Sequence, residues 1–208
     1  MYFSKNVFIN CPFDNDYFPL LKSILFTLVY LDFEPMIAET SDAGVSRLSK
    51  VKRLVMESKF SIHDLSRVQL GDETGLPRFN MPFECGIDLG ARILELPGSE
   101  AKKCLILETE KYRYQKFMSD IAGNDIRAHH DDPELAMKNV RDWLKINNKQ
   151  QKFARHSSIW MVFNEFEQDY NGLLEKDGYD IFDINAATFT DLIEFMKQWL
   201  EAWRERKK

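Results

Sequence analysis

Apolar residues along the first half of the chain form short continuous runs separated by longer stretches with helical spacing. The short runs, which predict buried strands, are residues 6–10, 34–39, 59–66 and 103–109. The stretches with apolar positions every three or four residues, which predict helices, are residues 16–33, 46–58 and 81–94. Uninterrupted apolar strands that alternate with helices are typical of a parallel sheet covered on both faces. We therefore expect an α/β domain with about five parallel strands.

The second half of the chain is mainly helical. Residues 111–120 predict a short helix, and residues 124–130 predict a fifth strand at the sheet edge. A helix at 132–147 begins with Asp132 and Pro133 as cap and first-turn residues. The last two predicted helices are residues 153–176 and 188–207. We expect an α/β domain over residues 1–148 and a helical extension over 149–208, packed on that domain or on a partner subunit.

Composition and charge limit the classes of function. A chain of 208 residues with 44% hydrophobic content can bury one sizeable core. The net charge of −5 argues against general nucleic-acid binding, which favours a basic surface. Three widely spaced cysteines, Cys11, Cys85 and Cys104, fit a reducing compartment. No apolar stretch reaches the length of a membrane span, so we expect a cytoplasmic protein without membrane contact.

Candidate ligand-binding residues follow the predicted strands. Right-handed crossovers place every strand-to-helix loop at one edge of a parallel sheet, and ligands bind outside the carboxyl ends of the strands. The side chains expected at this edge are Asn10, Pro12, Phe13, Asp42, Arg47, Asp64, Ser66 and Asn80. The sequence contains neither a GxGxxG motif nor a P-loop, which disfavours redox use of a dinucleotide and ATP hydrolysis.

The stretch NMPFEC, which opens the helix after the third strand, carries a carboxylate at the predicted ligand edge. If Asn80 or Met81 caps this helix, Pro82 and Glu84 lie in its first turn. The free amide groups and the helix dipole there favour an ionised carboxylate. A favourable first-turn charge is the simplest interpretation of Glu84. The polar residues expected beside it also make it the leading catalytic candidate.

The remainder of the same helix has two glycines four residues apart. Gly86 and Gly90 are expected on one side, where they would let the helix approach a strand or a neighbouring helix closely. A glycine inside a helix costs about 1 kcal/mol relative to alanine, so a pair suggests a packing requirement. The apolar residues Phe83, Ile87 and Leu94 are expected to face the sheet.

Three stretches in this order, VFINCPFD, IHDLS and NMPFECGIDLGA, carry a family resemblance. Over residues 6 to about 147 the chain resembles the nucleoside 2-deoxyribosyltransferase-like and the Toll/interleukin-1 receptor (TIR)-like families, which share a flavodoxin-type fold. It looks most similar to bacterial TIR-like proteins. In the first family a glutamate opens a helix in a motif whose counterpart here is FECGIDLGA. In the second, a glutamate at the equivalent place supports cleavage of the nicotinamide–ribose bond of NAD.

The resemblance implies cleavage of an N-glycosidic bond in NAD or a related nucleotide, by hydrolysis or cyclisation, with NAD as substrate and without a cofactor or metal. Glu84 would stabilise the positive charge that develops on the ribose, or form a covalent intermediate. Asp64 would bind the base or a ribose hydroxyl, or would instead cap its own loop. The resemblance further implies a homo-oligomer, an activating partner protein and a role in antiphage defence.

Other interpretations remain open at this stage. A catalytically silent nucleotide-sensing or protein-interaction module would have the same fold, because function resides in the site. Base exchange between deoxynucleosides is the third alternative. The sequence HHDD at 129–132 is expected to form a solvated turn, since adjacent side chains rarely bind one metal ion. His63 is expected to be packed or on the surface.

Overall fold

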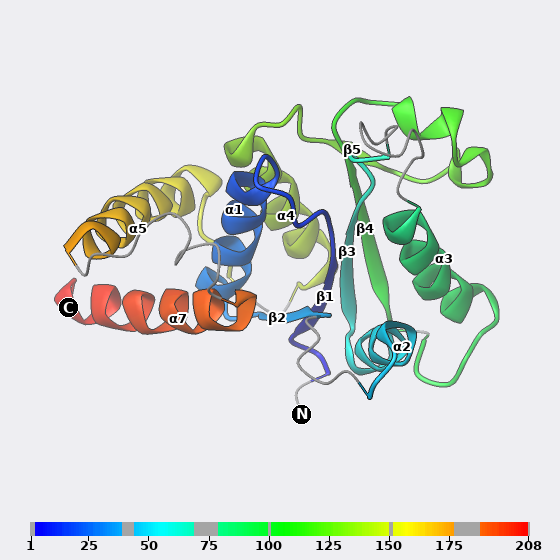
Figure 1. Ribbon diagram of the computed structural model, residues 1–208, viewed down its shortest axis with the longest axis horizontal. Helices are drawn as coiled ribbons and strands as arrows, with labels where there is room; N and C mark the ends of the chain where they lie inside the picture. The colour runs from blue at the N-terminus through cyan, green and yellow to red at the C-terminus, as the bar shows by residue number, and fades with distance from the viewer. Residues whose placement is uncertain are drawn as a thin grey trace.

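A five-stranded, all-parallel sheet runs through the centre of the protein (Figure 1). The computed structural model describes residues 3–38, 44–68, 79–99, 101–149, 152–176 and 188–207. The strands are β1 (Asn6–Asn10), β2 (Glu34–Ile37), β3 (Phe60–Asp64), β4 (Lys103–Glu108) and β5 (Arg127–Ala128). Their spatial order, β2-β1-β3-β4-β5, is that of flavodoxin-like folds. The α/β fold expected from the apolar pattern is therefore confirmed.

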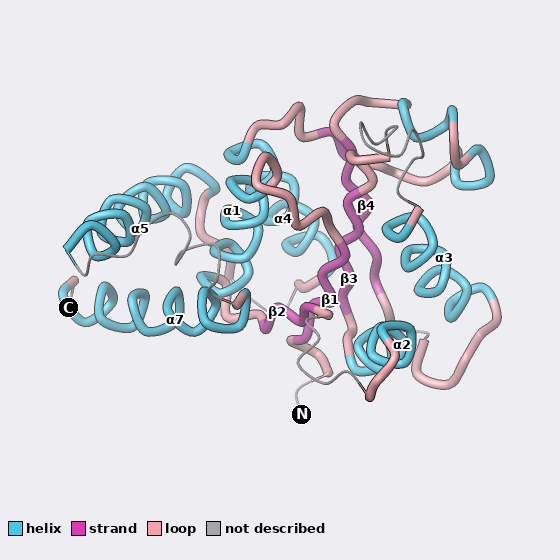
Figure 2. Tube along the Cα trace, viewed as in Figure 1, coloured by secondary structure: helices cyan, strands magenta, loops and turns pink. Residues whose placement is uncertain are grey.

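Helices cover both faces of the sheet (Figures 1 and 2). The helices are α1 (Phe18–Tyr30), α2 (Arg47–Glu57), α3 (Asn80–Ile93), α4 (Pro133–Asn147), α5 (His156–Lys176) and α7 (Phe189–Arg206). Helices α1 and α4 lie on one face, and α2 and α3 lie on the other. The short helix expected at 111–120 is a pair of 3-10 turns, η1 (Arg113–Lys116) and η2 (Ser119–Ile121).

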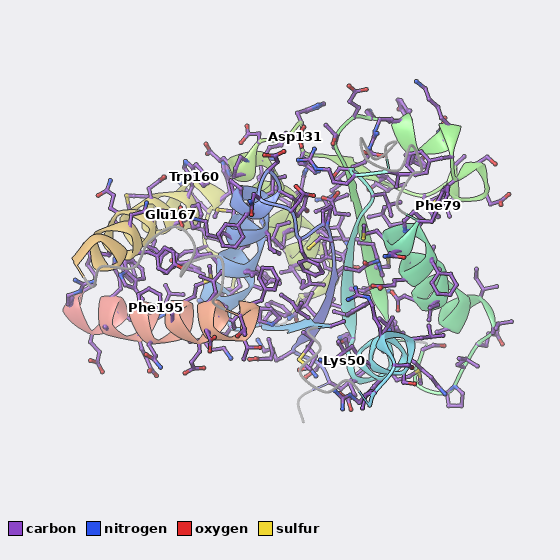
Figure 3. The ribbon with its side chains drawn as sticks, in the orientation of Figure 1. Lys50, Phe79, Asp131, Trp160, Glu167 and Phe195 are labelled. Atoms are coloured by element: carbon purple, nitrogen blue, oxygen red, sulfur yellow. The ribbon has the colours of Figure 1, made fainter. Side chains whose placement is uncertain are left out.

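Helix α1 is buried on almost every side, because α5 and α7 cover the surface that it turns away from the sheet. The Phe26 ring lies 5.2 Å from the Phe166 ring and 6.2 Å from the Trp199 ring. Lys22 of α1 donates to Glu167 of α5 at 2.6 Å. Figure 3 shows the side chains that fill this region. The C-terminal helices thus share one continuous core with the α1 side of the sheet.

The inner face of α3 differs from the expected one. Phe83 is 60% exposed and Leu94 is also exposed, so neither faces the sheet. The buried residues of α3 are Met81, Glu84, Cys85, Asp88 and Ala91. The physical reason lies in β3, whose side chains beneath α3 are polar and hydrogen-bond to Asp88. Hydrogen bonds between polar side chains, and not the spacing of apolar residues, therefore determine which face of α3 is turned toward the sheet.

No described element packs closely against the two glycines of α3, so the expectation that they allow a close approach is wrong. A Cβ atom added at Gly86 or Gly90 would meet nothing within 4 Å among the described residues. We predict that Gly86→Ala and Gly90→Ala each raise the free energy of unfolding by about 0.5–1 kcal/mol, because alanine loses less backbone entropy.

Urea unfolding measures this effect of the two glycines. Gly98→Ala is the matched control, because Gly98 has a φ of 83° and alanine there would be strained. Destabilisation by both α3 substitutions would show that the glycines have a structural role that the open space around them does not reveal.

Candidate functional site

Buried polar residues collect at the carboxyl ends of the strands. Asn10 ends β1, Asp64 ends β3 and Glu108 ends β4, and all three are buried. In this strand order β2 is added on one side of β1, whereas β3, β4 and β5 are added on the other side. Flavodoxin-like proteins bind ligands at the switch point between β1 and β3, where the order of addition reverses. The structure thus places Asn10 and Asp64 at the position where this fold forms a ligand crevice.

Glu84 lies beside this switch point and pairs with Arg47. Its carboxylate is buried, at 4% exposure, and Arg47 Nε donates to Oε1 at 2.9 Å. Arg47 is the first residue of α2, whose cap is Ser46. Phe79 is the N-cap of α3, so Asn80 is an exposed first-turn residue and Glu84 falls beyond the first turn. The expectation of a first-turn carboxylate was wrong, and Arg47 supplies the positive partner.

Asn10 presents an unpaired acceptor at the end of β1. Its Nδ2 donates to the Met81 carbonyl at 2.9 Å and lies 2.9 Å from His63 Nδ1. The carbonyl can only accept, which fixes the orientation of the Asn10 amide. Asn10 Oδ1 is buried and has no hydrogen-bond partner in the described part of the chain. A buried acceptor left unpaired costs about 1–3 kcal/mol, so a ligand donor here would be favourable.

Asp64 caps its own loop and joins three elements. Oδ1 accepts from the Ser66 amide at 2.8 Å, and Oδ2 accepts from the Tyr17 hydroxyl at 2.6 Å. His129 Nε2 lies 3.1 Å from Oδ2. Burial alone would raise the pKa of Asp64, but the contacts with His129, Ser66 and Tyr17 lower it below its ordinary value. The loop-capping alternative is observed, while a role for Asp64 in substrate binding stays a prediction.

His129 is part of this site and does not lie in a solvated turn. Its ring is fully buried beneath the strand ends. Nδ1 accepts from the Asp131 amide at 3.0 Å, which leaves the ring proton on Nε2, facing Asp64. Asp132 caps α4, as the sequence predicts, by accepting from the amides of Glu134 and Leu135. The expectation of a solvated HHDD turn was wrong for His129, since its partner Asp64 is distant in sequence.

The stability of the protein is expected to fall as the pH drops below about 4. The pKa of Asp64 is lower in the folded state, so its carboxylate adds stability above the unfolded pKa, and this stability is lost as the pH falls through the folded pKa. Asp64→Asn should therefore destabilise the protein at pH 7 by about 1–3 kcal/mol and have a smaller effect in acid.

Denaturant unfolding at neutral and acid pH tests this dependence. Asp16→Asn is the control, because Asp16 is an exposed residue of the loop between β1 and α1. An Asp64→Asn effect that stays constant across the acid range would contradict a titrating role for this carboxylate.

Cys11, directly after β1, is near enough to both carboxylates proposed from the sequence to feel their charge. Burial raises the pKa of its thiol well above the ordinary value, and the negative charges of Asp64, Glu84 and Asp14 raise it further. Glu84 approaches from the α3 side, whereas Asp64 contacts Tyr17 on the α1 side. The structure therefore brings the two acids to the same end of β1, on opposite faces of the sheet.

The remaining predicted residues have different environments. Pro12 and Ser66 are buried, and Ser66 Oγ has no hydrogen-bond partner among the described residues. Phe13 is partly exposed, and its ring lies 5.0 Å from the Phe189 ring at the start of α7. Asp42 lies outside the described residues.

Glu108 is a site residue that the sequence interpretation missed. Its Oε1 accepts from Arg113 Nη2 at 2.6 Å and Nε at 3.0 Å, while Oε2 is buried and unpaired within the described residues. Burial raises the pKa of Glu108 more than Arg113 lowers it. Arg113 also donates to the Ser66 carbonyl. The sequence feature that could have identified Glu108 is an acidic residue at the end of a predicted strand, which is also the position of Asp64.

A buried polar network lies directly beneath α3. Asp88 Oδ2 accepts from the Ser61 hydroxyl and lies 3.2 Å from His63 Nε2. Lys102 Nζ lies 3.2 Å from Asp88 Oδ1 and donates to two backbone carbonyls, one in the last turn of α2 and one directly after it. Burial would raise the pKa of Asp88, but His63, Lys102 and Ser61 lower it well below its ordinary value. The network connects to Asn10 through His63, and so forms the floor of the candidate site.

The ligating atoms of His63, Asp88 and Cys104 lie within 4.8 Å of one another, which is the arrangement in the described chain most suited to a metal ion. The cavities found elsewhere lie beside β5 and α4, beneath α3 and beside β2, away from Glu84.

No helix among the described residues is long and apolar enough to cross a membrane. Comparisons with protein-family models, curated proteins and solved structures found no match to this chain.

Proposed function

We propose that the protein binds a nucleotide at the carboxyl ends of β1 and β3 and cleaves its N-glycosidic bond, with NAD or a related nucleotide as substrate. The observation that carries this proposal is Glu84, a buried carboxylate paired with Arg47 beside the switch point. Cleavage of an N-glycosidic bond builds positive charge on the ribose ring. An anionic carboxylate stabilises that charge or attacks the anomeric carbon.

The surrounding residues have chemistry that suits a ribose and its base. Arg47 holds the Glu84 carboxylate in one orientation through Oε1. Asn10 Oδ1 and Ser66 Oγ are buried polar atoms without partners in the described part of the chain, and a ribose hydroxyl or a base amide pairs with such atoms. Phe13, half-exposed at the end of β1, offers a ring for stacking on a base.

A catalytically silent nucleotide-sensing module is the second candidate. The same ion pair favours it, because Arg47 neutralises the charge that catalysis requires of Glu84. The oxygens of Asp64 are likewise engaged by protein groups. In this function the nucleotide would bind at the same edge and be released unchanged.

The proposal includes assembly of the protein with copies of itself, in the cytoplasm and in defence against phage, as the family resemblance implies. Large apolar side chains exposed on α3 and at its ends support self-association: Phe79, Phe83, Ile93 and Leu94. The assay of activity should therefore use concentrated protein, so that assembly is complete.

Product analysis of a substrate panel separates these functions. The panel contains NAD, NADP and the common deoxynucleosides, each with and without an added free base. Release of nicotinamide from NAD supports the proposal, and the accompanying product distinguishes hydrolysis from cyclisation. Transfer of a sugar to the added base would assign a deoxyribosyltransferase instead. Nucleotide binding without any product would overturn catalysis and assign the sensing module.

A further inference from the structure

Two cysteines from different elements meet beneath α3, apart from the proposed catalytic carboxylate. Cys85 belongs to the inner face of α3, and Cys104 belongs to β4. The two side chains pack in the same cluster, and the neighbouring thiol is the largest influence on the pKa of each cysteine. The sulfur of Cys104 also lies within 4.8 Å of the ligating atoms of His63 and Asp88. A thiol pair in contact with an imidazole and a carboxylate has the composition of a reactive site.

The two thiols differ in access to solvent. Cys104 lines a cavity of about 1090 Å³, together with Leu89, Ser99 and Ile106, whereas Cys85 is fully buried. The neighbouring Cys85 thiol lowers the pKa of Cys104 below its ordinary value, and the Cys104 thiol in turn raises the pKa of Cys85. A small reagent in the cavity would therefore meet Cys104 first, and in its nucleophilic form.

A resident metal ion suits this cluster less well than thiol chemistry does. His63 Nδ1 accepts from Asn10, so the ring proton lies on Nε2, the atom that would have to bind the metal. The Lys102 ammonium lies 3.2 Å from Asp88 Oδ1 and so occupies the position of a competing cation. The lysine thus supplies the positive charge that Asp88 requires, whereas the two cysteines form no disulfide and remain available for thiol chemistry.

We propose that Cys104 and Cys85 form a peroxide-reactive dithiol that closes reversibly to a disulfide. The Cys104 thiolate attacks one oxygen of hydrogen peroxide, breaks the O–O bond and becomes a sulfenic acid, and the leaving hydroxide takes a proton to give water. The Cys85 sulfur then attacks the sulfenic sulfur, and the expelled hydroxyl group takes the Cys85 proton as a second water. One peroxide is reduced and two thiols are oxidised.

The disulfide would link β4 to the turn of α3 that carries Glu84. Because Cys85 follows Glu84 directly, closure would constrain the position of this carboxylate. Disulfides of proteins in reducing compartments are commonly transient and redox-sensing. The chemistry of the dithiol itself does not depend on the proposed glycosidic activity.

The test treats the full-length protein with hydrogen peroxide and maps its cysteines by mass spectrometry. The expected product is two hydrogens lighter, has a Cys85–Cys104 linkage, keeps Cys11 as a free thiol and returns to the starting mass with dithiothreitol. Cys104 should react about tenfold or more faster than Cys11, which is buried among carboxylates.

Three variants separate the roles of the cysteines. Cys11→Ser should form the disulfide as the wild type does, which makes it the matched control. Cys85→Ser should accumulate a sulfenic or sulfinic acid at Cys104, and Cys104→Ser should form no disulfide. The proposal is overturned if the folded wild type forms no Cys85–Cys104 bond, or if Cys11 reacts as fast as Cys104. Circular dichroism before and after treatment confirms that the reaction occurs in the folded protein.

Discussion

Lys102→Met is expected to lower the free energy of unfolding by about 3–5 kcal/mol. The lysine side chain is only 3% exposed, and its ammonium faces the fully buried Asp88 carboxylate at 3.2 Å. Methionine fills most of the same space but leaves the carboxylate charged, buried and without its cation. The loss should be smaller at low pH, where protonation removes the unpaired charge of Asp88.

Denaturant unfolding of a double-mutant cycle measures this interaction. Asp88→Asn alone should cost a similar amount at neutral pH, because it leaves the buried Lys102 ammonium without its opposite charge, and the double variant should cost less than the sum of the two. Lys138→Met is the control for an exposed pair, since Lys138 and Asp142 are both partly exposed, and it should cost less than about 1 kcal/mol. Equal effects of the two lysine substitutions would contradict the account of a buried charge pair.

Glu84→Gln is expected to reduce the rate of N-glycosidic cleavage by about 100- to 1000-fold or more, the effect of removing a charge aimed at a transition state. Glutamine has the same shape, so the substrate should still bind and KM should change little. The amide oxygen can still accept from Arg47 Nε, the contact that Oε1 makes in the wild type. The expected loss is therefore in kcat.

The fold of this variant should persist. The Arg47 side chain is 44% exposed and the Glu84 side chain 6% exposed, and glutamine can still accept the hydrogen bond from Arg47 Nε, so the loss of stability should stay within about 1–3 kcal/mol. Glu201→Gln is the matched control, because Glu201 is an exposed residue of α7 and lines a cavity with Asn6 and Glu34, at the amino ends of β1 and β2. If Glu84→Gln unfolded, its loss of activity would not show a catalytic role for Glu84. The melting temperature of each variant is therefore measured together with its kinetics.

Elements that bury apolar residues in a regular pattern could be predicted from the sequence. The strands β1 to β4 all lie within the ranges expected from the apolar pattern, although Ser61 and His63 interrupt the apolar run of β3. The orientation of α3 was not predictable in this way. Its periodicity points Phe83 and Leu94 inward, yet the structure buries Glu84 and Asp88, because β3 supplies polar partners for Asp88. The spacing of apolar residues along a helix carries no information about the side chains of the strand against which the helix packs.

The candidate site shows the same limit. The place of Glu84 and Asn10 at the strand ends followed from the order of strands and helices. The roles of His129 and Glu108 did not, because a buried polar residue looks like a surface residue until its partner is known. His129 pairs with Asp64, 65 positions earlier in the chain, and Glu108 pairs with an arginine in a 3-10 turn. Such pairs depend on the tertiary fold.

The most direct test of the central claim is chromatographic measurement of nicotinamide released from NAD by concentrated wild-type protein, Glu84→Gln and Glu201→Gln. The account predicts release by the wild type and Glu201→Gln, with a loss of about 100-fold or more in Glu84→Gln. Equal release by Glu84→Gln and the wild type would contradict the role of this carboxylate. Absence of free base from every nucleotide of the panel with the assembled wild type would contradict glycosidic cleavage itself.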